Sequence, residues 1–388
     1  MKRVNAITFL NYFVSGSLTL IIPLLLLAHN VNIADIGIVL SILPLVFLIA
    51  RLFFAAIADY VGWSHVFLLI NWPSTFLSCS IYYFASSLPA FALGKFVESL
   101  RESSYWAVSR TAIYHLSPKK AGNEATKNNA TIWLATAFGG GAAGIGIASL
   151  GFNSTIAVLA IVSTTIGIPA FMLWKSSATI PIPKTTHILA PLNPKGRTRT
   201  FWLVSIAIMF NSLAIYPLTT LLLPAFMNQQ LAYSYITIGV LFMFYNAISA
   251  ITTYLTVKYS LNFARAAILT VISITASVFL GSSTFFIACL LALAFVRGYG
   301  IGFFEHTVLK VAKGSKNISV DIGLLHAPMR IAEFSSMISA GFLVQYLGYS
   351  NISGNRHLLW SILLPITIHF EIQIGVNRVK HKANFDVI

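Results

Sequence analysis

Residues 55–64 have the sequence Ala55-Ala56-Ile57-Ala58-Asp59-Tyr60-Val61-Gly62-Trp63-Ser64 and separate two long apolar stretches, 35–57 and 65–85. An α-helix needs about 20 predominantly apolar residues to cross a bilayer. Both flanking stretches reach that length. We therefore expect the segment to be a short loop that joins two membrane crossings at the membrane surface.

The composition of the whole chain also indicates a membrane protein. Charged residues make up 9% of the 388 residues, whereas a soluble domain has about 25%. The net charge of +15 does not indicate nucleic-acid binding, because the basic residues flank apolar spans and form no basic, aromatic-interleaved patch. Cys79 and Cys289 lie far apart in apolar spans without metal-ligand spacing. We therefore expect no metal and no cofactor.

The apolar stretches predict an all-α integral membrane protein with twelve transmembrane helices. The predicted spans are 6–28, 35–57, 65–85, 89–113, 127–149, 154–174, 201–227, 234–256, 265–283, 285–308, 320–346 and 357–376. The first is too long for the apolar region of a signal peptide, so we interpret it as a retained crossing. A proline-rich connection divides the chain into a six-helix half at 1–176, a linker at 177–199 and a second half at 200–388.

Basic residues predict the orientation of the chain. One set of alternate loops contains Lys2, Arg3, Arg110, Lys119, Lys120, Lys127, Lys175, Lys184, Lys195, Arg197, Arg199, Lys258, Arg265, Lys310, Lys313, Lys316, Arg378, Lys380 and Lys382. The loops of the opposite face contain Arg356. Positive residues concentrate on the cytoplasmic side of membrane proteins. We therefore expect a cell-membrane protein with both termini and the central linker in the cytoplasm.

The two halves resemble each other at a constant offset near 200 residues. Thr8-Phe9-Leu10-Asn11 parallels Ile208-Met209-Phe210-Asn211, and Ile36-Gly37 parallels Ile238-Gly239. Duplicated halves are typical of transporters that bind a solute between two rocking bundles near the membrane midplane.

The 55–64 loop resembles the loop signature of the major facilitator superfamily (MFS), Gly-x-Leu-Ala-Asp-Arg-x-Gly-Arg-Arg. Ile57, Ala58, Asp59 and Gly62 match, while the basic residues of the pattern are absent. The resemblance implies that Asp59 and Gly62 belong to a cytoplasmic gate. Asp59 could accept backbone hydrogen bonds at a helix start or pair with an arginine. The alternative is a simple helix-end cap.

The stretch Leu93-Gly94-Lys95-Phe96-Val97-Glu98-Ser99 is similar to the Arg-x-x-Gln-Gly pattern of the same family. The resemblance covers the whole chain and implies the MFS fold. In that fold, spans 1, 4, 7 and 10 line a central cavity, and spans 3, 6, 9 and 12 face lipid.

Span 4 contains a charged group at the depth where a solute site is expected. Glu98 follows the external start of the span by about nine residues, which places it roughly 14 Å deep at 1.5 Å per residue. Arg101, Glu102 and Tyr105 follow at i+3, i+4 and i+7 and share its helix face. A charge at the bilayer centre costs roughly 2.5–3.5 kcal/mol and needs a partner. The group predicts a proton-coupling site; the alternative is a static ion-pair network.

Spans 1, 7, 10 and 11 supply the other candidates. Arg330 and Glu333 share a face with His326 and are expected to form a second half of the ion-pair site, or a structural pair. Arg297 is the positional counterpart of Lys95 and is expected on the cavity. Further substrate-cavity candidates are the amides and phenols Asn11, Tyr12, Tyr105, Asn211 and Tyr216. The alternative for such residues is hydrogen bonding between helices, which is common in membrane bundles.

These observations predict a secondary active transporter that moves a small solute by alternating access, with protons coupled through Glu98 or Glu102. Arg101, Arg297 and Arg330 favour an anionic or zwitterionic substrate, and the alternative is a cation, because acids lie beside these arginines. We expect a monomer surrounded by lipid, without a nucleic-acid partner. The alternatives are a passive facilitator, or an enzyme or receptor without transport. The sequence contains no phosphate loop and no Gly-x-Ser-x-Gly motif, so it does not favour an enzyme.

Overall fold

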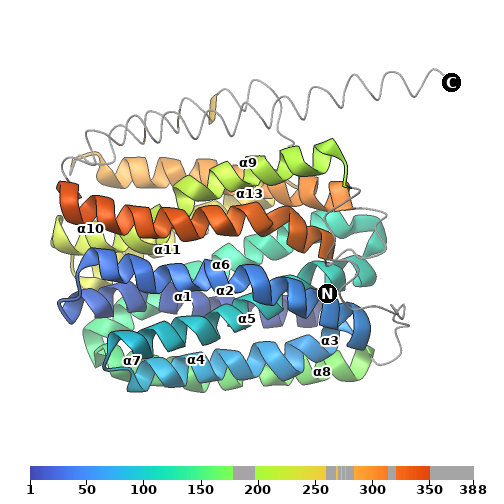
Figure 1. Cartoon of the computed structure of the whole chain (residues 1–388), viewed down its shortest axis with the longest axis horizontal. Helices are drawn as coiled ribbons and strands as arrows, with labels where there is room; N and C mark the ends of the chain where they lie inside the picture. The colour runs from blue at the N-terminus through green and yellow to red at the C-terminus, as the bar shows by residue number, and fades with distance from the viewer. Residues whose placement is uncertain are drawn as a thin grey trace.

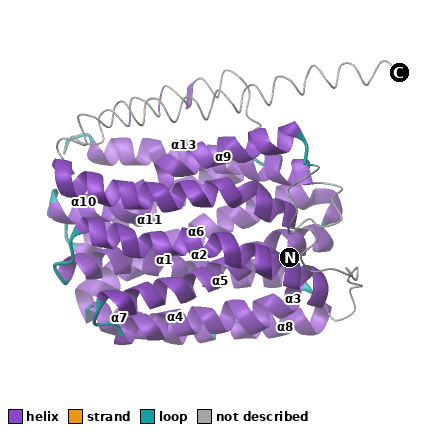
Figure 2. Ribbon diagram, viewed as in Figure 1, coloured by secondary structure: helices purple, strands orange, loops and turns teal. Residues whose placement is uncertain are grey.

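The computed structural model describes residues 1–177, 197–258, 268, 269, 272, 276, 284–312 and 320–349. Long helices run side by side along the molecule, and the described residues form no strand (Figure 1, Figure 2). The helices are α1 (Lys2–Ala28), α2 (Ile33–Val61), α3 (Trp63–Val66), α4 (Trp72–Phe84), α5 (Leu88–Leu116), α6 (Ala121–Leu150), α7 (Phe152–Thr164), α8 (Gly167–Ser177), α9 (Arg199–Pro217), α10 (Leu223–Gln229), α11 (Tyr235–Leu255) and α13 (Phe286–Ala312), followed by a helix over 320–349.

Three short segments extend these helices. The π-helical turn η1 (Phe67–Asn71) joins α3 to α4, the 3-10 turn η2 (Pro118–Lys120) precedes α6, and the π-helical turn η4 (Leu218–Leu222) joins α9 to α10. Helical structure therefore lies over predicted spans 1–8, 10 and 11. Predicted span 12, most of predicted span 9 and most of the 177–199 linker fall outside the described residues, so the count of twelve stays a prediction.

Six helical stretches in the described part are long and apolar enough to cross a membrane: Lys2–Ala28, Ile33–Ala58, Pro118–Leu150, Phe152–Ser176, Arg199–Gln229 and Tyr235–Leu255. Helix α5 is as long as these but carries Lys95, Glu98, Arg101, Glu102 and Arg110. Most of these charged side chains are buried against other helices. Helix α5 therefore belongs to the interior of the bundle, as its charges predicted.

Local sequence signals begin and end several helices. The Asn32 side chain accepts a hydrogen bond from Asp35 N at 2.8 Å, and Ser234 accepts one from Thr237 N at 3.2 Å. Both residues are preferred helix N-caps. Helix α2 continues to Val61 and α3 begins at Trp63, so the loop expected over 55–64 is reduced to Gly62. The φ of Gly62 is 102°, a value that is disfavoured for residues with a Cβ atom. The backbone conformation at this turn therefore explains why the loop signature has a glycine at position 62.

Glycines permit close contact between distant helices. A Cβ atom built on Gly144 of α6 would lie 2.7 Å from the Cα atom of Gly239 in α11. A Cβ atom built on Gly37 of α2 would lie 2.9 Å from the Met337 oxygen in the 320–349 helix. Small residues allow helix backbones to approach in membranes. The first and second predicted halves thus meet along two seams, α6 with α11 and α2 with the 320–349 helix.

The end of the bundle that the basic residues predict to be external is closed by apolar side chains. Residues of α1, including Leu20, Ile21 and Leu24, share one buried cluster with Leu221 and Met227 of η4 and α10. Helix α1 and helix α10 pack directly against each other. Side chains from both halves therefore seal this end.

Candidate functional site

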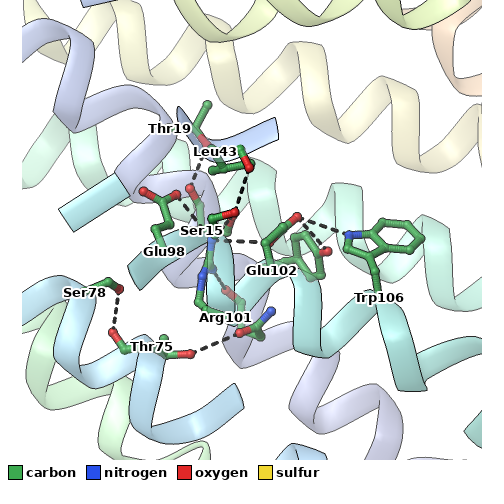
Figure 3. A network of polar contacts seen from close by, with 12 residues as sticks. Ser15, Thr19, Leu43, Thr75, Ser78, Glu98, Arg101, Glu102 and Trp106 are labelled. Atoms are coloured by element: carbon green, nitrogen blue, oxygen red, sulfur yellow. Dashed lines mark hydrogen bonds and ion pairs between the residues drawn. The ribbon is translucent and has the colours of Figure 1, made fainter. Parts of the chain in front are cut away.

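Glu98 of α5 belongs to a buried polar network that also contains Arg101 and Glu102 (Figure 3). Its Oε2 atom accepts hydrogen bonds from Lys95 Nζ at 2.8 Å and from the Tyr82 hydroxyl at 2.7 Å. Its Oε1 atom lies 3.3 Å from Arg101 Nη2. Glu98 and Arg101 are 1% and 0% exposed, respectively, which shows that this carboxylate is enclosed by protein and ion-paired.

Arg101 connects Glu98 to Glu102. Its Nη2 atom is 3.3 Å from Glu102 Oε2, the same distance as to Glu98. The guanidinium also donates to the Asn11 carbonyl oxygen at 3.2 Å and to Ser15 Oγ at 3.0 Å. Four contacts to α1 and α5 thus hold one cation between two carboxylates, as the spacing of the three charges predicted.

Glu102 has a different environment from Glu98. Its Oε1 atom accepts hydrogen bonds from the Tyr12 hydroxyl at 3.0 Å and from Trp106 Nε1 at 3.2 Å. Its side chain is 13% exposed and borders a central cavity. Of the two predicted proton-coupling carboxylates, Glu102 is the one in contact with that cavity.

The cavity has a volume of about 230 Å³ and lies between segments of the two predicted halves. Its lining comes from α1, α2, α5, α6, α9, η4, α13 and the 320–349 helix, so it includes the predicted spans 1, 4, 7 and 10. The polar side chains of the lining are Tyr12, Arg51, Glu102, Asn129, Asn211, Ser212, Tyr216, Thr219, Arg297, His326, Arg330 and Glu333.

Arg330 and Glu333 form the second predicted ion pair, on the 320–349 helix. Arg330 Nη1 donates to Glu333 Oε2 at 2.6 Å. The Arg330 guanidinium carbon also lies 3.6 Å from the ring centroid of Phe47 in α2, within the range of a cation–π contact. The pair therefore borders the cavity and also joins two helices that are distant in sequence.

Arg297 of α13 reaches the cavity beside aromatic residues of α6 and α11. Its guanidinium carbon is 4.0 Å from the Trp133 ring centroid and 5.2 Å from that of Tyr245. Its Nη1 atom donates to Asn246 Oδ1 at 3.4 Å. No acidic side chain within the described ranges forms an ion pair with it. Arg297 is therefore held by aromatic faces and an amide.

The structure separates the predicted cavity residues into two groups. Tyr12, Asn211, Tyr216 and Arg297 line the cavity. Of the described residues that we expected there, Asn11 and Tyr105 lie outside its lining, because their polar groups face neighbouring helices. Asn11 Oδ1 accepts from Asn71 and Thr75, both at 3.4 Å. The Tyr105 hydroxyl is 2.8 Å from Thr8 Oγ1 and 3.1 Å from Asn128 Oδ1.

The sequence interpretation did not select several cavity residues. Arg51, Trp106, Asn129, Trp133 and Ser212 line the cavity. Arg51 carried a usable signal, because it is a charged residue within an apolar span. The other four have no such signal, since tryptophan, serine and asparagine occur on many helix faces. The side chain of Asp59, which we expected at a cytoplasmic gate, lies outside the described part of the structure.

The described residues contain no group of three or more His, Cys, Asp or Glu side chains that could hold a metal ion. Cys79 and Cys289 are both buried free thiols. The chemistry available at the cavity is therefore that of arginines, carboxylates, phenols, amides and indoles, which can bind a polar solute and exchange protons.

Comparisons with known proteins agree with this architecture. The family model of the Major Facilitator Superfamily matches residues 4–313. The human organic anion transporter MFSD10 (TETRAN) has a similar structure, with a TM-score of 0.71, 15% identity, and coverage of 95% of this chain and 99% of that one. A bacterial homologue of the human lysosomal transporter Spinster, in an inward-facing and occupied conformation, gives a TM-score of 0.66, 15% identity, and coverage of 96% and 95%. No curated protein sequence matches. The chain belongs to the Major Facilitator Superfamily and is a multi-pass membrane protein of solute transport.

Proposed function

We propose that this protein is a secondary active transporter that moves a small solute by alternating access and couples the movement to protons through Glu102. The observation that carries the proposal is the position of Glu102, which borders the cavity and lies 3.3 Å from the Arg101 guanidinium. A carboxylate in contact with both a solute cavity and a fixed cation can change its protonation when the access of the cavity to water changes.

Arginine keeps its charge at any relevant pH. Protonation of Glu102 therefore leaves Arg101 one anionic contact fewer, and the guanidinium then relies on Glu98 and on the groups of α1 that accept its hydrogen bonds. Helix α1 also belongs to the apolar cluster that closes one end of the bundle. Protonation of Glu102 can therefore change the contacts that Arg101 makes with α1, a helix that closes one end of the bundle.

Glu98 serves in this proposal as the buried counter-charge. It is in contact with Lys95, Tyr82 and Arg101 and lies behind the cavity wall. The proposed orientation has both termini and the central linker in the cytoplasm, so that the apolar closure between α1 and α10 is external. We propose the cell membrane as the location and an anionic or zwitterionic small molecule as the solute.

The test uses purified full-length protein in proteoliposomes. A thermal-shift screen of small carboxylates and amino acids first identifies a solute, because a ligand of the native state raises its apparent stability. Solute-driven proton movement is then recorded with a pH-sensitive dye inside the vesicles. We expect Glu102→Gln to abolish it and Glu124→Gln, a change of an acid on the cytoplasmic part of α6, to preserve it.

Glu98→Gln is the third variant measured in the same proton-movement assay. Proton movement that is unchanged in Glu102→Gln would contradict coupling through Glu102, and its loss in Glu98→Gln alone would assign the coupling to Glu98. Solute equilibration without any proton movement in the wild-type protein would favour the passive facilitator. Binding without flux would favour a receptor.

A further inference from the structure

The charges on the cavity wall differ in whether an opposite charge already neutralises them. Glu333 accepts from Arg330 at 2.6 Å, and Glu102 lies 3.3 Å from Arg101. Arg297 has no carboxylate partner among the described side chains. The described lining contains three arginines and two glutamates. Each glutamate is ion-paired, whereas Arg297 has no carboxylate partner in the described structure, so Arg297 contributes an unneutralised positive charge to the cavity.

We infer that the cavity binds a small organic monoanion, with its anionic group on Arg297 and its apolar body against the aliphatic wall. The inference rests on the proposed transport function and names the substrate class of the same cavity. It is independent of proton coupling, because Arg297 and Glu102 lie on different helices and form no contact in the described structure.

The surroundings of Arg297 are suited to hold an anion. The Trp133 ring lies on one face of the guanidinium at 4.0 Å and limits its orientations. Arginine presents its donors in a planar fork that matches a carboxylate, and stacking on an aromatic ring leaves the edge of that fork available. The Arg297 Nε and Trp133 Nε1 atoms are buried and donate to no protein atom within the described ranges. Beside Arg297, the site therefore offers two hydrogen-bond donors that no protein atom uses in the described structure.

The wall of the cavity determines what the rest of the ligand can be. Ile132, Ile208, Ile215, Ile301 and Met329 contribute apolar surface. A highly polar solute would lose its hydration along such a wall without replacement hydrogen bonds, at a cost in affinity. A small inorganic anion would leave this wall uncovered. An aromatic or aliphatic monocarboxylate satisfies both the arginine and the apolar surface.

The experiment measures binding to the detergent-purified full chain, with small probes that differ in their charge or in their apolar body. The probes are benzoate, benzamide and benzylamine, together with hexanoate and inorganic phosphate. We expect the two carboxylates to raise the unfolding temperature and to give a measurable Kd by calorimetry. The neutral amide, the amine and phosphate should bind at least about tenfold more weakly, because each lacks either the charge or the apolar body.

Variants assign the effect to the proposed residue. Arg297→Gln should raise the Kd of benzoate at least about 30-fold, the range for loss of one partner of a buried, hydrogen-bonded charge pair. Arg297→Lys should weaken binding less, because it keeps the charge. The matched control is Arg199→Gln, since Arg199 is exposed at the start of α9 and should leave binding unchanged. Trp133→Leu provides a second variant in case Arg297→Gln does not fold, and should weaken benzoate more than hexanoate.

Three results would overturn the inference: preferential binding of benzylamine, benzoate affinity that survives in both Arg297→Gln and Trp133→Leu, or no binding of either carboxylate at about 10 mM, a concentration at which weak ligands still stabilise a native state. Failure of the proposed function looks different. Carboxylate binding that requires Arg297, combined with flux that moves no protons, would keep this inference and reject proton coupling.

Discussion

Glu98 and Glu102 are one helical turn apart on α5, yet of the two only Glu102 borders the central cavity. The Arg101 guanidinium lies 3.3 Å from each carboxylate. A single helix thus carries one carboxylate that protein encloses and one in contact with the solute space. The two acids are therefore expected to respond differently to the same Glu→Gln substitution.

The first prediction concerns the stability role of Glu98. Glu98→Gln removes the ion-pair partner of Lys95, whose Nζ atom is 2.8 Å from Glu98 and 2% exposed. Loss of one partner of a buried pair costs about 3–5 kcal/mol. We expect a clear fall in the unfolding temperature of the detergent-purified protein. Glu102→Gln should lower it less, because Glu102 is partly exposed at the cavity.

The double variant Lys95→Met/Glu98→Gln is the control for this prediction. It removes both charges, so no uncompensated cation remains beside position 98, and we expect it to recover most of the loss. A double variant as unstable as Glu98→Gln alone would show that packing, and not the ion pair, controls stability at this point.

The seam between α6 and α11 should be sensitive to side-chain size. A Cβ atom on Gly144 would lie 2.5 Å from the Tyr235 carbonyl oxygen, which is too close for the backbones to keep their positions. We expect Gly144→Ala to cost about 1–3 kcal/mol of stability, as overpacking does. Gly300→Ala is the matched control, because no atom lies within 4 Å of the added methyl group. Equal unfolding temperatures for both variants would disprove the close contact.

Arg330 and Phe47 are expected to be energetically coupled. The guanidinium carbon lies 3.6 Å from the ring centroid, and a desolvated cation–π contact contributes about 2 kcal/mol. A double-mutant cycle with Arg330→Lys and Phe47→Leu measures this term. Lysine keeps the charge beside Glu333, so the cycle reports mainly the stacking. Strict additivity of the two changes would argue against the contact.

The orientation of the chain can be tested with single cysteines in a Cys79→Ala, Cys289→Ala background. Lys119 and Asn153 are both exposed and lie at opposite ends of α6. The distribution of basic residues predicts a cytoplasmic Lys119 and an external Asn153. A membrane-impermeant maleimide should therefore label Asn153→Cys in intact cells and Lys119→Cys after permeabilisation. The reverse labelling would invert the proposed orientation.

Much of the fold could be predicted from sequence because lipid imposes a local rule. A chain segment in the bilayer must form hydrogen bonds among its own backbone groups and expose apolar side chains to lipid. The positions of the spans therefore follow from runs of apolar residues in the sequence. The helices over predicted spans 1–8, 10 and 11 agree with that reasoning. The spacing of Glu98, Arg101 and Glu102 likewise predicted a shared helix face, and Gly62 has the positive φ that its motif position requires.

The sequence by itself determined the helical class, the predicted spans and the candidate charged residues, because these depend on composition and on periodicity within one helix. The tertiary structure decided which candidates meet the cavity. The rotation of each helix about its axis and the distance between neighbouring helices depend on contacts between distant segments, such as Gly144 with Gly239. The sequence of a single helix does not determine them. For that reason Glu102, Trp133 and Arg297 line the cavity, while Asn11 and Tyr105 form hydrogen bonds between helices.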